Sequence, residues 1–373
     1  MSPAVLGEQN QQRSGSLNPV ELCEFAAKGL VPMLDPQSRI FCDICVRSGD
    51  GIARTGLSPR YTMMTLLGLH RYEQAGNRAG LSSQEIFDTL VRETGWISCA
   101  GDLGLLLWTC AELAPERLPE IYTKIRAESA LARFPDAQQG RTMEMAWFLT
   151  GAATCMLAGF AALPGLAEQA RTARRILERN SGTFGMYGHV GNAYFPTSYL
   201  RHHIGSFADQ VYPAIAFARL TRALKDEDAR QSALRTAQAM CERQGEMGEW
   251  FWQYDAKTGR VVSRYPVFSV HQHAMAPMML FEVAEATGCD FRANIDRGLE
   301  WIAGNNELGR DLVDPALKLV WRCIHLGRRA AYADAALRFF GLRQGPANPH
   351  SLRIRYECRP YELGWLLYAF AGR

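Results

Sequence analysis

Two kinds of helical segment alternate along the chain. The first kind is polar with one apolar stripe and covers residues 20–34, 83–94, 116–127, 167–180, 228–244, 291–306 and 328–340. The second kind is apolar on nearly every face and covers residues 59–72, 102–113, 143–160, 213–223, 275–286, 315–326 and 360–370. A striped helix covers a core from outside, whereas a helix that is apolar all round is buried on every side. The pattern therefore predicts outer and inner helices in turn.

The repetition of this pair predicts an all-α fold, an α/α toroid (barrel) of six or seven helical hairpins. The count stays open by one because an end helix could cap the ring. A proline stands near the start of five inner segments, where its missing N–H has no partner to lose; these are Pro59, Pro213, Pro277, Pro315 and Pro360. We expect a single domain over residues 20–373. Residues 1–19 are rich in Gln, Ser, Gly and Asn and predict a flexible tail.

Some connections into the inner helices are too long for plain turns. Residues 39–46 precede the turn sequence at 48–51, and residues 250–254 precede the one at 255–259, so both pairs predict short β-ribbons. All such connections precede inner helices and should gather at one rim of the toroid. Long ordered loops commonly carry binding sites, so we expect the pocket at this rim.

Composition narrows the classes of function. The chain has 373 residues, 47% of them hydrophobic, and a net charge of only +3 with Lys and Arg scattered, which argues against nucleic-acid or anionic-membrane partners. Residues 145–167 lack charge, but a buried inner helix explains this stretch more simply than a membrane span does. Ten cysteines spread from Cys23 to Cys358, without a signal peptide, favour reduced thiols and a cytoplasmic location.

The predicted rim collects groups that can transfer protons. Histidine titrates near neutrality, and carboxylates at helix starts can act as acids or bases, although an acid there can also simply cap its helix. The catalytic candidates are His203, His271, His273, Glu144, Asp209 and Glu362.

Aromatic rings and arginines accompany them. Aromatic side chains can stack on sugar faces or isoprenoid chains, or simply fill the core, and arginine can pair with a carboxylate or phosphate, which admits an anionic substrate. The substrate-binding candidates are Arg60, Asp102, Trp147, Tyr199, Arg201, Tyr212, Trp250, Trp252, Gln272, Arg322, Glu357, Arg359, Tyr361 and Trp365.

Metal and cofactor motifs are weak. Four histidines with Asp209 could bind zinc, but the sequence contains no HExxH, and Cys42 and Cys45 form a single CxxC without a second pair. Walker A, GxSxG and dinucleotide fingerprints are absent from the sequence as well. We therefore expect neither a metal nor a cofactor.

The whole plan, with acids, histidines and aromatics at the starts of inner helices, resembles the six-hairpin glycosidase-like toroids. These include sugar hydrolases, N-acylglucosamine 2-epimerase-like isomerases and some uronate lyases. The resemblance covers most of the chain as architecture, and no complete catalytic motif of one family is present. It implies that His203, His271 or His273 acts with Glu144, Asp209 or Glu362.

A second resemblance is local. Residues 244–250, from Gln244 through Gly248 to Trp250, match the QxxxGxW pattern of terpene cyclases and prenyltransferase-like toroids. In those proteins the motif is structural, its Gln capping a helix and stacking on the Trp. The DxDD protonation motif of such cyclases is missing here.

Three functions follow as hypotheses. The first is an enzyme that acts on a saccharide or sugar conjugate, as a hydrolase, epimerase or lyase, because a hydrocarbon would not require so many charged groups at the rim. The alternative is a terpene-cyclase-like or prenyl-binding protein, which predicts a pocket of Phe, Trp and Met with a buried protonated acid. The third is a noncatalytic glycan- or partner-binding toroid, which predicts that acids and histidines lie out of reach of one another with unshifted pKa values.

Overall fold

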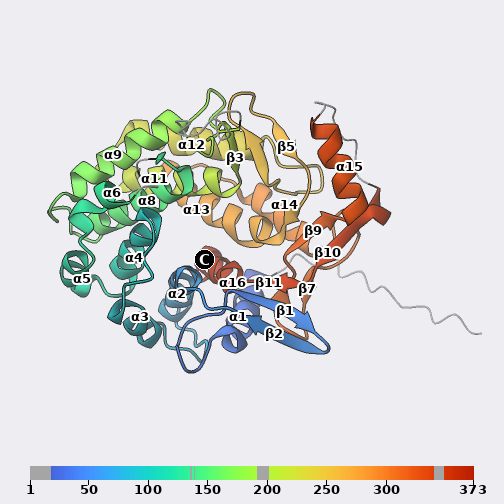
Figure 1. Ribbon diagram of the computed structural model, residues 1–373, viewed down its shortest axis with the longest axis horizontal. Coiled ribbons are helices and arrows are strands. Elements are labelled where there is room, and N and C mark those ends of the chain that lie inside the picture. The colour runs from blue at the N-terminus through green and yellow to red at the C-terminus, as the bar shows by residue number, and fades with distance from the viewer. Residues whose placement is uncertain (1–17, 135–136, 138, 191–200, 340–347) are drawn as a thin grey trace, which may run out of the picture.

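The computed structural model describes residues 18–134, 137, 139–190, 201–339 and 348–373. Six inner helices form a closed ring in this part of the chain, because α2 contacts both the next inner helix, α4, and the last one, α16 (Figure 1). The inner helices are α2 (Pro59–Gln74), α4 (Ala100–Leu113), α8 (Thr142–Leu157), α11 (Ala208–Leu224), the π-helical turn η4 (His271–Met275) continued by α13 (Ala276–Thr287), and α16 (Pro360–Phe370).

Six outer helices pack against this ring in the described residues. They are α1 (Pro19–Leu30), α3 (Ser83–Arg92), α5 (Leu118–Lys124) with the single turn α6 (Ala130–Arg133), α9 (Leu166–Asn180), α12 (Glu227–Cys241) and α14 (Arg292–Ile302). The predicted α/α toroid is confirmed, with six hairpins. The predicted tail, residues 1–19, lies outside the described residues except for Asn18, which caps α1, and Pro19, which begins it.

The predicted inner helix at residues 315–326 is wrong. This stretch forms the hairpin β7 (Val313–Asp314) with β8 (Leu319–Val320), followed by strand β9 (Cys323–Leu326). Asp314 Oδ1 accepts hydrogen bonds from the N–H groups of Ala316 and Leu317, and Lys318 adopts φ +58°, so the chain reverses after Pro315. The expected outer helix after it does form, as α15 (Arg328–Phe339), but it stands off the ring (Figure 1).

The prolines occupy several positions. Pro59, Pro277 and Pro360 stand in the first turns of α2, α13 and α16, as predicted. Pro213 instead lies inside α11, and Pro315 lies in the β7–β8 turn. Pro277 has no N–H to donate to the carbonyl of His273, and the chain just before it takes the wider π turn of η4.

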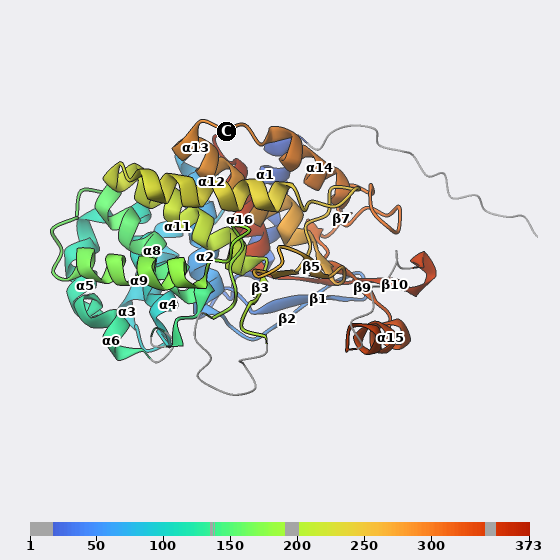
Figure 2. The same cartoon turned by 90° about the horizontal axis from the view of Figure 1, so that it is seen from above.

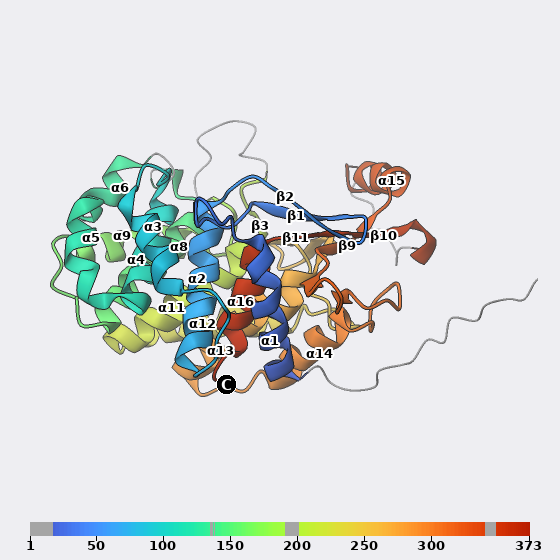
Figure 3. The ribbon, with the colours of Figure 1, turned by 90° about the horizontal axis from the view of Figure 1, so that it is seen from below.

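Short sheets lie at one end of the ring, beside the N-terminal ends of the inner helices (Figures 2 and 3). Both predicted ribbons are confirmed: β1 (Ile44–Ser48) pairs with β2 (Gly51–Thr55), and β4 (Gln253–Asp255) pairs with β5 (Val261–Ser263). The strands β3 (Ile204–Ser206), β6 (Val267–Phe268), β10 (Leu352–Arg355) and β11 (Glu357–Cys358) complete the sheets ordered β11-β1-β2, β10-β9-β6 and β3-β4-β5. We call this end the rim.

The opposite end of the ring is closed by a network of buried charges, which we call the ion network. Each inner helix supplies one member; they are Arg71, Glu112, Thr154, Arg219, Glu282 and Tyr368. Arg219 Nη2 lies 2.8 Å from Glu282 Oε1 and 2.9 Å from Glu112 Oε1, and Arg219 Nη1 donates to Thr154 Oγ1 at 2.6 Å. Burial would raise the pKa of Glu282, but the charges of Arg219 and Arg71 outweigh it and lower that pKa to about 2.

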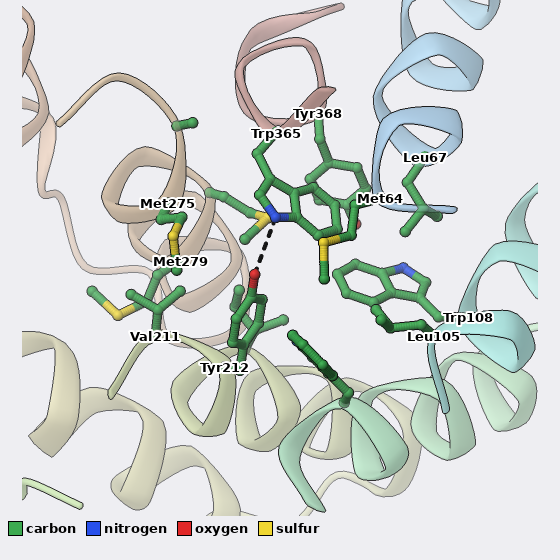
Figure 4. Close-up of a cluster of buried hydrophobic side chains, with 14 of the residues drawn as sticks. Met64, Leu67, Leu105, Trp108, Val211, Tyr212, Met275, Met279, Trp365 and Tyr368 are labelled. Atoms are coloured by element: carbon green, nitrogen blue, oxygen red, sulfur yellow. Dashed lines mark hydrogen bonds between the residues drawn. The ribbon is translucent and has the colours of Figure 1, made fainter. Parts of the chain in front are cut away.

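Between the ion network and the rim lies an aromatic and sulfur-rich core (Figure 4). Trp108 stacks on Trp365 with ring centroids 5.4 Å apart, and Tyr368 meets both rings edge-on. Trp365 Nε1 donates to the Tyr212 hydroxyl at 3.0 Å. These four aromatic residues, Trp108, Tyr212, Trp365 and Tyr368, lie between the buried helices, and we call them the central column.

Removing the carboxylate of Glu282 should be strongly destabilising. Glu282→Ala leaves two buried arginines, Arg219 and Arg71, to share the single carboxylate of Glu112, which costs about 3–5 kcal/mol of unfolding free energy. Glu285→Ala is the matched control, because that half-exposed carboxylate pairs with Arg222 and Arg373 at the surface and should cost at most about 1 kcal/mol. Urea unfolding measures both, and equal losses would contradict a central role for the ion network.

Ring closure also requires a glycine. A Cβ added to Gly68 of α2 would lie 1.9 Å from the carbonyl oxygen of Gly364 in α16, and backbone cannot move aside as a side chain can. Gly68→Ala should cost about 1–3 kcal/mol or more in urea unfolding. At Gly95, where a Cβ meets no atom within 4 Å, the same substitution should be neutral within about 1 kcal/mol.

Candidate functional site

Three cavities at the rim share lining residues, and we call them together the rim groove. The central cavity has a volume of about 230 Å³. It shares Arg60 and Tyr61 with a cavity of about 250 Å³ that contains Asp102, and it shares Ser206 with a cavity of about 400 Å³ that contains Asp209. The groove therefore passes over the N-terminal ends of α4, α2 and α11.

The central cavity brings together seven of the predicted site residues: Arg60, Trp147, Tyr212, Trp252, His271, Arg322 and Tyr361. They come from four inner helices, η4 and the rim loops. The remaining lining is Tyr61, Met64, Met143, Ser206, Ala208, Phe268, Val270 and Met275. Two cations and several aromatic faces thus share a small space, which suits a compact, partly anionic ligand.

Glu144 and Asp209 are two predicted acids that each keep a buried oxygen without a partner in the described part of the chain. Asp209 lines the cavity of about 400 Å³, whereas Glu144, in the first turn of α8, lines none of the three cavities. Both side chains are buried, and neither Glu144 Oε2 nor Asp209 Oδ1 has a hydrogen-bond partner among the described residues. Asp209 Oδ2 accepts hydrogen bonds from Ser206 N at 2.8 Å and Ser206 Oγ at 2.9 Å, and lies 3.2 Å from His189 Nδ1. Hydrogen bonds therefore fix Oδ2 of Asp209, while Oδ1 has no such partner among the described residues.

The pKa values of Glu144 and His189 are both raised, but for different reasons. Burial, and then the nearby charge of Asp209, raises the pKa of Glu144, which favours the protonated acid. The hydrogen bond to Asp209 raises the pKa of His189 although burial opposes it. Neither His189 nor Ser206 was among the sequence candidates. The serine could have been found, because it stands three residues before Asp209 at the start of α11, but nothing local links His189 to that carboxylate.

Arg60 and Asp102 form an ion pair beside the central cavity. Arg60 Nε donates to Asp102 Oδ1 at 2.6 Å, and Ser98 donates to Oδ2 through its N–H at 3.0 Å and its hydroxyl at 2.8 Å. Burial would raise the pKa of Asp102, but its bonds with Arg60 and Ser98 outweigh this and lower it. The Arg60 guanidinium lies 5.6 Å from the centre of the Trp147 ring and faces the groove from a fixed position.

A second cationic group lies across the cavity. Arg322 Nη1 bonds Glu362 Oε1 at 2.6 Å, and Arg322 Nε lies 3.8 Å from Glu357. Glu362 is fully buried, and as the third residue of α16 it accepts a hydrogen bond from the N–H of Arg359, the N-cap of that helix. Arg359 Nη1 also donates to the Tyr61 hydroxyl. Glu362 thus orients Arg322, and its own carboxyl does not line the groove.

The two histidines of η4 differ in position. His271 lines the central cavity and stacks on Phe207 with centroids 4.1 Å apart. Burial lowers the pKa of His271 to about 3 and that of His273, which lies in the core, to about 4. Both rings are therefore neutral at physiological pH, and His271 is suited to hydrogen bonding rather than to carrying charge.

The candidate residues that precede α11 do not all lie at the same place. Arg201 is exposed at the cavity that contains Asp209, whereas His203 Nε2 lies 3.9 Å from Asp255 and His203 does not line that cavity. Tyr199 lies outside the described residues.

Three predicted binding residues are packed in the core. Trp250 exchanges two hydrogen bonds with Gln272 through its backbone, and Trp365 belongs to the central column. Gln244, the first residue of the QxxxGxW match, donates to the carbonyls of Gly248 and Asn294 at 2.8 and 2.9 Å. The motif thus joins the end of α12 to α14, which is a structural task.

Within the described ranges, no three His, Cys, Asp or Glu side chains converge as a metal ion requires. Across those same ranges, every helix is too short or too polar to cross a bilayer.

Known protein families and curated proteins gave no match to this sequence.

Several solved structures have a similar fold. An unsaturated glucuronyl hydrolase specific for heparin aligns at 12% identity over 94% of this chain and 95% of its own, with a TM-score of 0.60. The unsaturated glucuronyl hydrolase of Bacillus sp. GL1 aligns at 15% identity over the same shares, with a TM-score of 0.58. An α-1,6-mannanase of Salegentibacter aligns at 12% identity over 95% and 98%, with a TM-score of 0.56. At such identities the likeness establishes the toroid fold.

The two acids should respond to pH with opposite signs. Glu144 has a raised pKa in the folded state, so ionising it costs stability as pH rises above its unfolded value, and Glu144→Gln should become progressively more stable than the parent protein. Asp102 has a lowered pKa, so its contribution is present above its unfolded value and lost as pH falls, and Asp102→Asn should cost most at neutral pH. Urea unfolding from about pH 2 to pH 8 measures both differences, because the contribution of Asp102 is lost only below the unfolded pKa of about 3.9. Parallel slopes for the two variants would contradict these environments.

Proposed function

We propose that this protein is a glycoside hydrolase that acts on a saccharide carrying an anionic group, with Glu144 as general acid and Asp209 as general base. The observation that carries the proposal is a pair of neighbouring buried carboxylates, each with one oxygen that has no partner among the described residues, Glu144 Oε2 and Asp209 Oδ1. Asp209 lines the rim groove, and its charge contributes to the raised pKa of Glu144. Vacant buried carboxylate oxygens are costly, and two such groups whose environments differ are what glycosidic hydrolysis requires.

Each group has a defined task in this proposal. Glu144, whose raised pKa keeps its proton available, donates that proton to the leaving glycosidic oxygen. Asp209, oriented by Ser206 and His189, accepts a proton from the water that attacks the sugar. The protons return to their starting positions through solvent after the products leave.

The binding groups complete the proposal. Arg60 and Arg322 are held by acids on one side and line the central cavity on the other, so each can pair with a substrate carboxylate. Trp147, Tyr212 and Trp252 offer ring faces to a sugar. The glucuronyl hydrolases with this fold act, by their names, on unsaturated glucuronyl groups, which makes an unsaturated uronate the first substrate to test.

The other hypotheses receive less support. A noncatalytic toroid predicts acids and histidines out of mutual reach, whereas His189 Nδ1 and Asp209 Oδ2 are 3.2 Å apart. A prenyl-binding protein is favoured by Met64, Met143 and Met275 in the lining, but two arginines share the same small cavity. Isoprenoid diphosphates therefore belong in the ligand panel.

The test is turnover of uronate-containing, amino-sugar and neutral oligosaccharides. Glu144→Gln and Asp209→Asn should each lower kcat by about 10²–10⁴-fold, because each removes one proton-transfer group. Glu300→Gln, on an exposed face of α14, is the matched control and should leave kcat unchanged. A new reducing end identifies hydrolysis, whereas a new ultraviolet-absorbing double bond would identify elimination instead. Binding of isoprenoid diphosphates alone would overturn the proposal.

A further inference from the structure

Positive charge is concentrated in one segment near the C-terminus. Residues 322–359 contain eight arginines and two histidines against two acids, Asp334 and Glu357, although the whole chain has a net charge of only +3. The rest of the chain is therefore net negative. This concentration was hidden in the sequence because the arginines are spaced apart and form no run.

The fold arranges five described arginines of this segment as a track that leaves the central cavity; they are Arg322, Arg328, Arg329, Arg353 and Arg355. Arg322 lines that cavity, and the β9–β10 ribbon begins beside it, with Arg355 opposite Cys323 and Arg353 opposite His325. At about 3.3 Å per residue, the four-residue ribbon extends about 13 Å outward. It ends at α15, which stands off the ring on the rim side of the molecule (Figures 2 and 3).

Three arginines on this track form no ion pair with a carboxylate of the described residues. Arg328, Arg329 and Arg355 are exposed, and no described carboxylate lies within 4.0 Å of them. Arg328 and Arg329 also occupy the first turn of α15, which contains no acid. The N-terminus of a helix is the positive end of its dipole, so two cations there are unfavourable in the free protein. A bound polyanion would relieve this repulsion.

We propose that the β9–β10 ribbon and the first turn of α15 form a basic arm that binds the anionic chain of a long polysaccharide outside the rim groove. The inference rests on the proposed function, since it assigns a second contact surface to the same substrate. Arg322 directly precedes β9 and lines the central cavity, so a chain that follows the arm reaches this cavity, which shares Ser206 with the cavity that contains Asp209. This continuity favours a saccharide over nucleic acid, because the arm leads into the cavity to which the proposed function assigns a saccharide.

The test measures binding of heparin and polygalacturonate at low salt. The arm variant is Arg328→Ala with Arg329→Ala and Arg355→Ala. The control removes three exposed arginines from α9, on another side of the ring, by Arg171→Ala, Arg175→Ala and Arg179→Ala, and so loses the same charge. All variants carry Glu144→Gln, so that binding is measured without turnover.

The arm variant should bind at least one of the two polyanions tenfold or more weakly than its parent, while the control stays within about threefold. Binding by the parent should fall steeply with salt and with a reduced slope in the arm variant, as for other contacts between arginines and a polyanion. Dextran, which is neutral, should not bind to the arm. Preference between heparin and polygalacturonate reports whether sulfate or carboxylate is recognised.

Three results would overturn the inference: no binding of either polyanion by the parent, equal losses in both triple variants, or tighter binding of a DNA duplex than of either polysaccharide. None of these results bears on whether Glu144→Gln abolishes turnover of short saccharides. Failure of the basic arm and failure of the proposed function are therefore distinguishable.

Discussion

The buried ion network at the closed end of the toroid fixes the positions of all the inner helices. Arg219 is almost fully buried, and its charge is tolerated only because Glu282 and Glu112 lie within 3 Å of it. Apolar contacts alone are non-directional and would let a ring of helices slide or rotate. Hydrogen bonds to Thr154 and Tyr368 are directional, so one arrangement of the six helices satisfies every partner.

The central column connects the ion network to the rim, so the position of the inner helices at the closed end also determines their position at the rim. Tyr368 belongs to the ion network and packs edge-on against Trp108 and Trp365 (Figure 4). Trp365 in turn donates to Tyr212, which lines the central cavity. The floor of the cavity is therefore set by residues that also hold the closed end. Loops at the rim can vary in sequence and still present their side chains over a fixed floor.

Sequence periodicity was sufficient for the ring because inner helices are apolar on all faces, a pattern that few other environments produce. It failed at residues 315–326, where an equally apolar stretch is divided by the turn at Asp314 and Lys318 and becomes strands. Glu144 and Asp209 could be predicted from their places at inner-helix starts. The contact between Asp209 and His189 could not, because it depends on how a rim loop folds back over a helix 20 residues later.

The two ends of the toroid treat buried charge in opposite ways. At the closed end Glu282 is paired with arginine, and its charge helps to hold the fold together. At the rim Glu144 and Asp209 each keep a buried oxygen without a partner among the described residues, and the nearby charge of Asp209 adds to burial in raising the pKa of Glu144. The unpaired oxygens at the rim cost stability, whereas the closed end pairs its charges. Such a contrast is typical of groups retained for chemistry. The paired charges of the closed end thus offset the cost of the unpaired oxygens at the rim, because the same six helices connect the two ends.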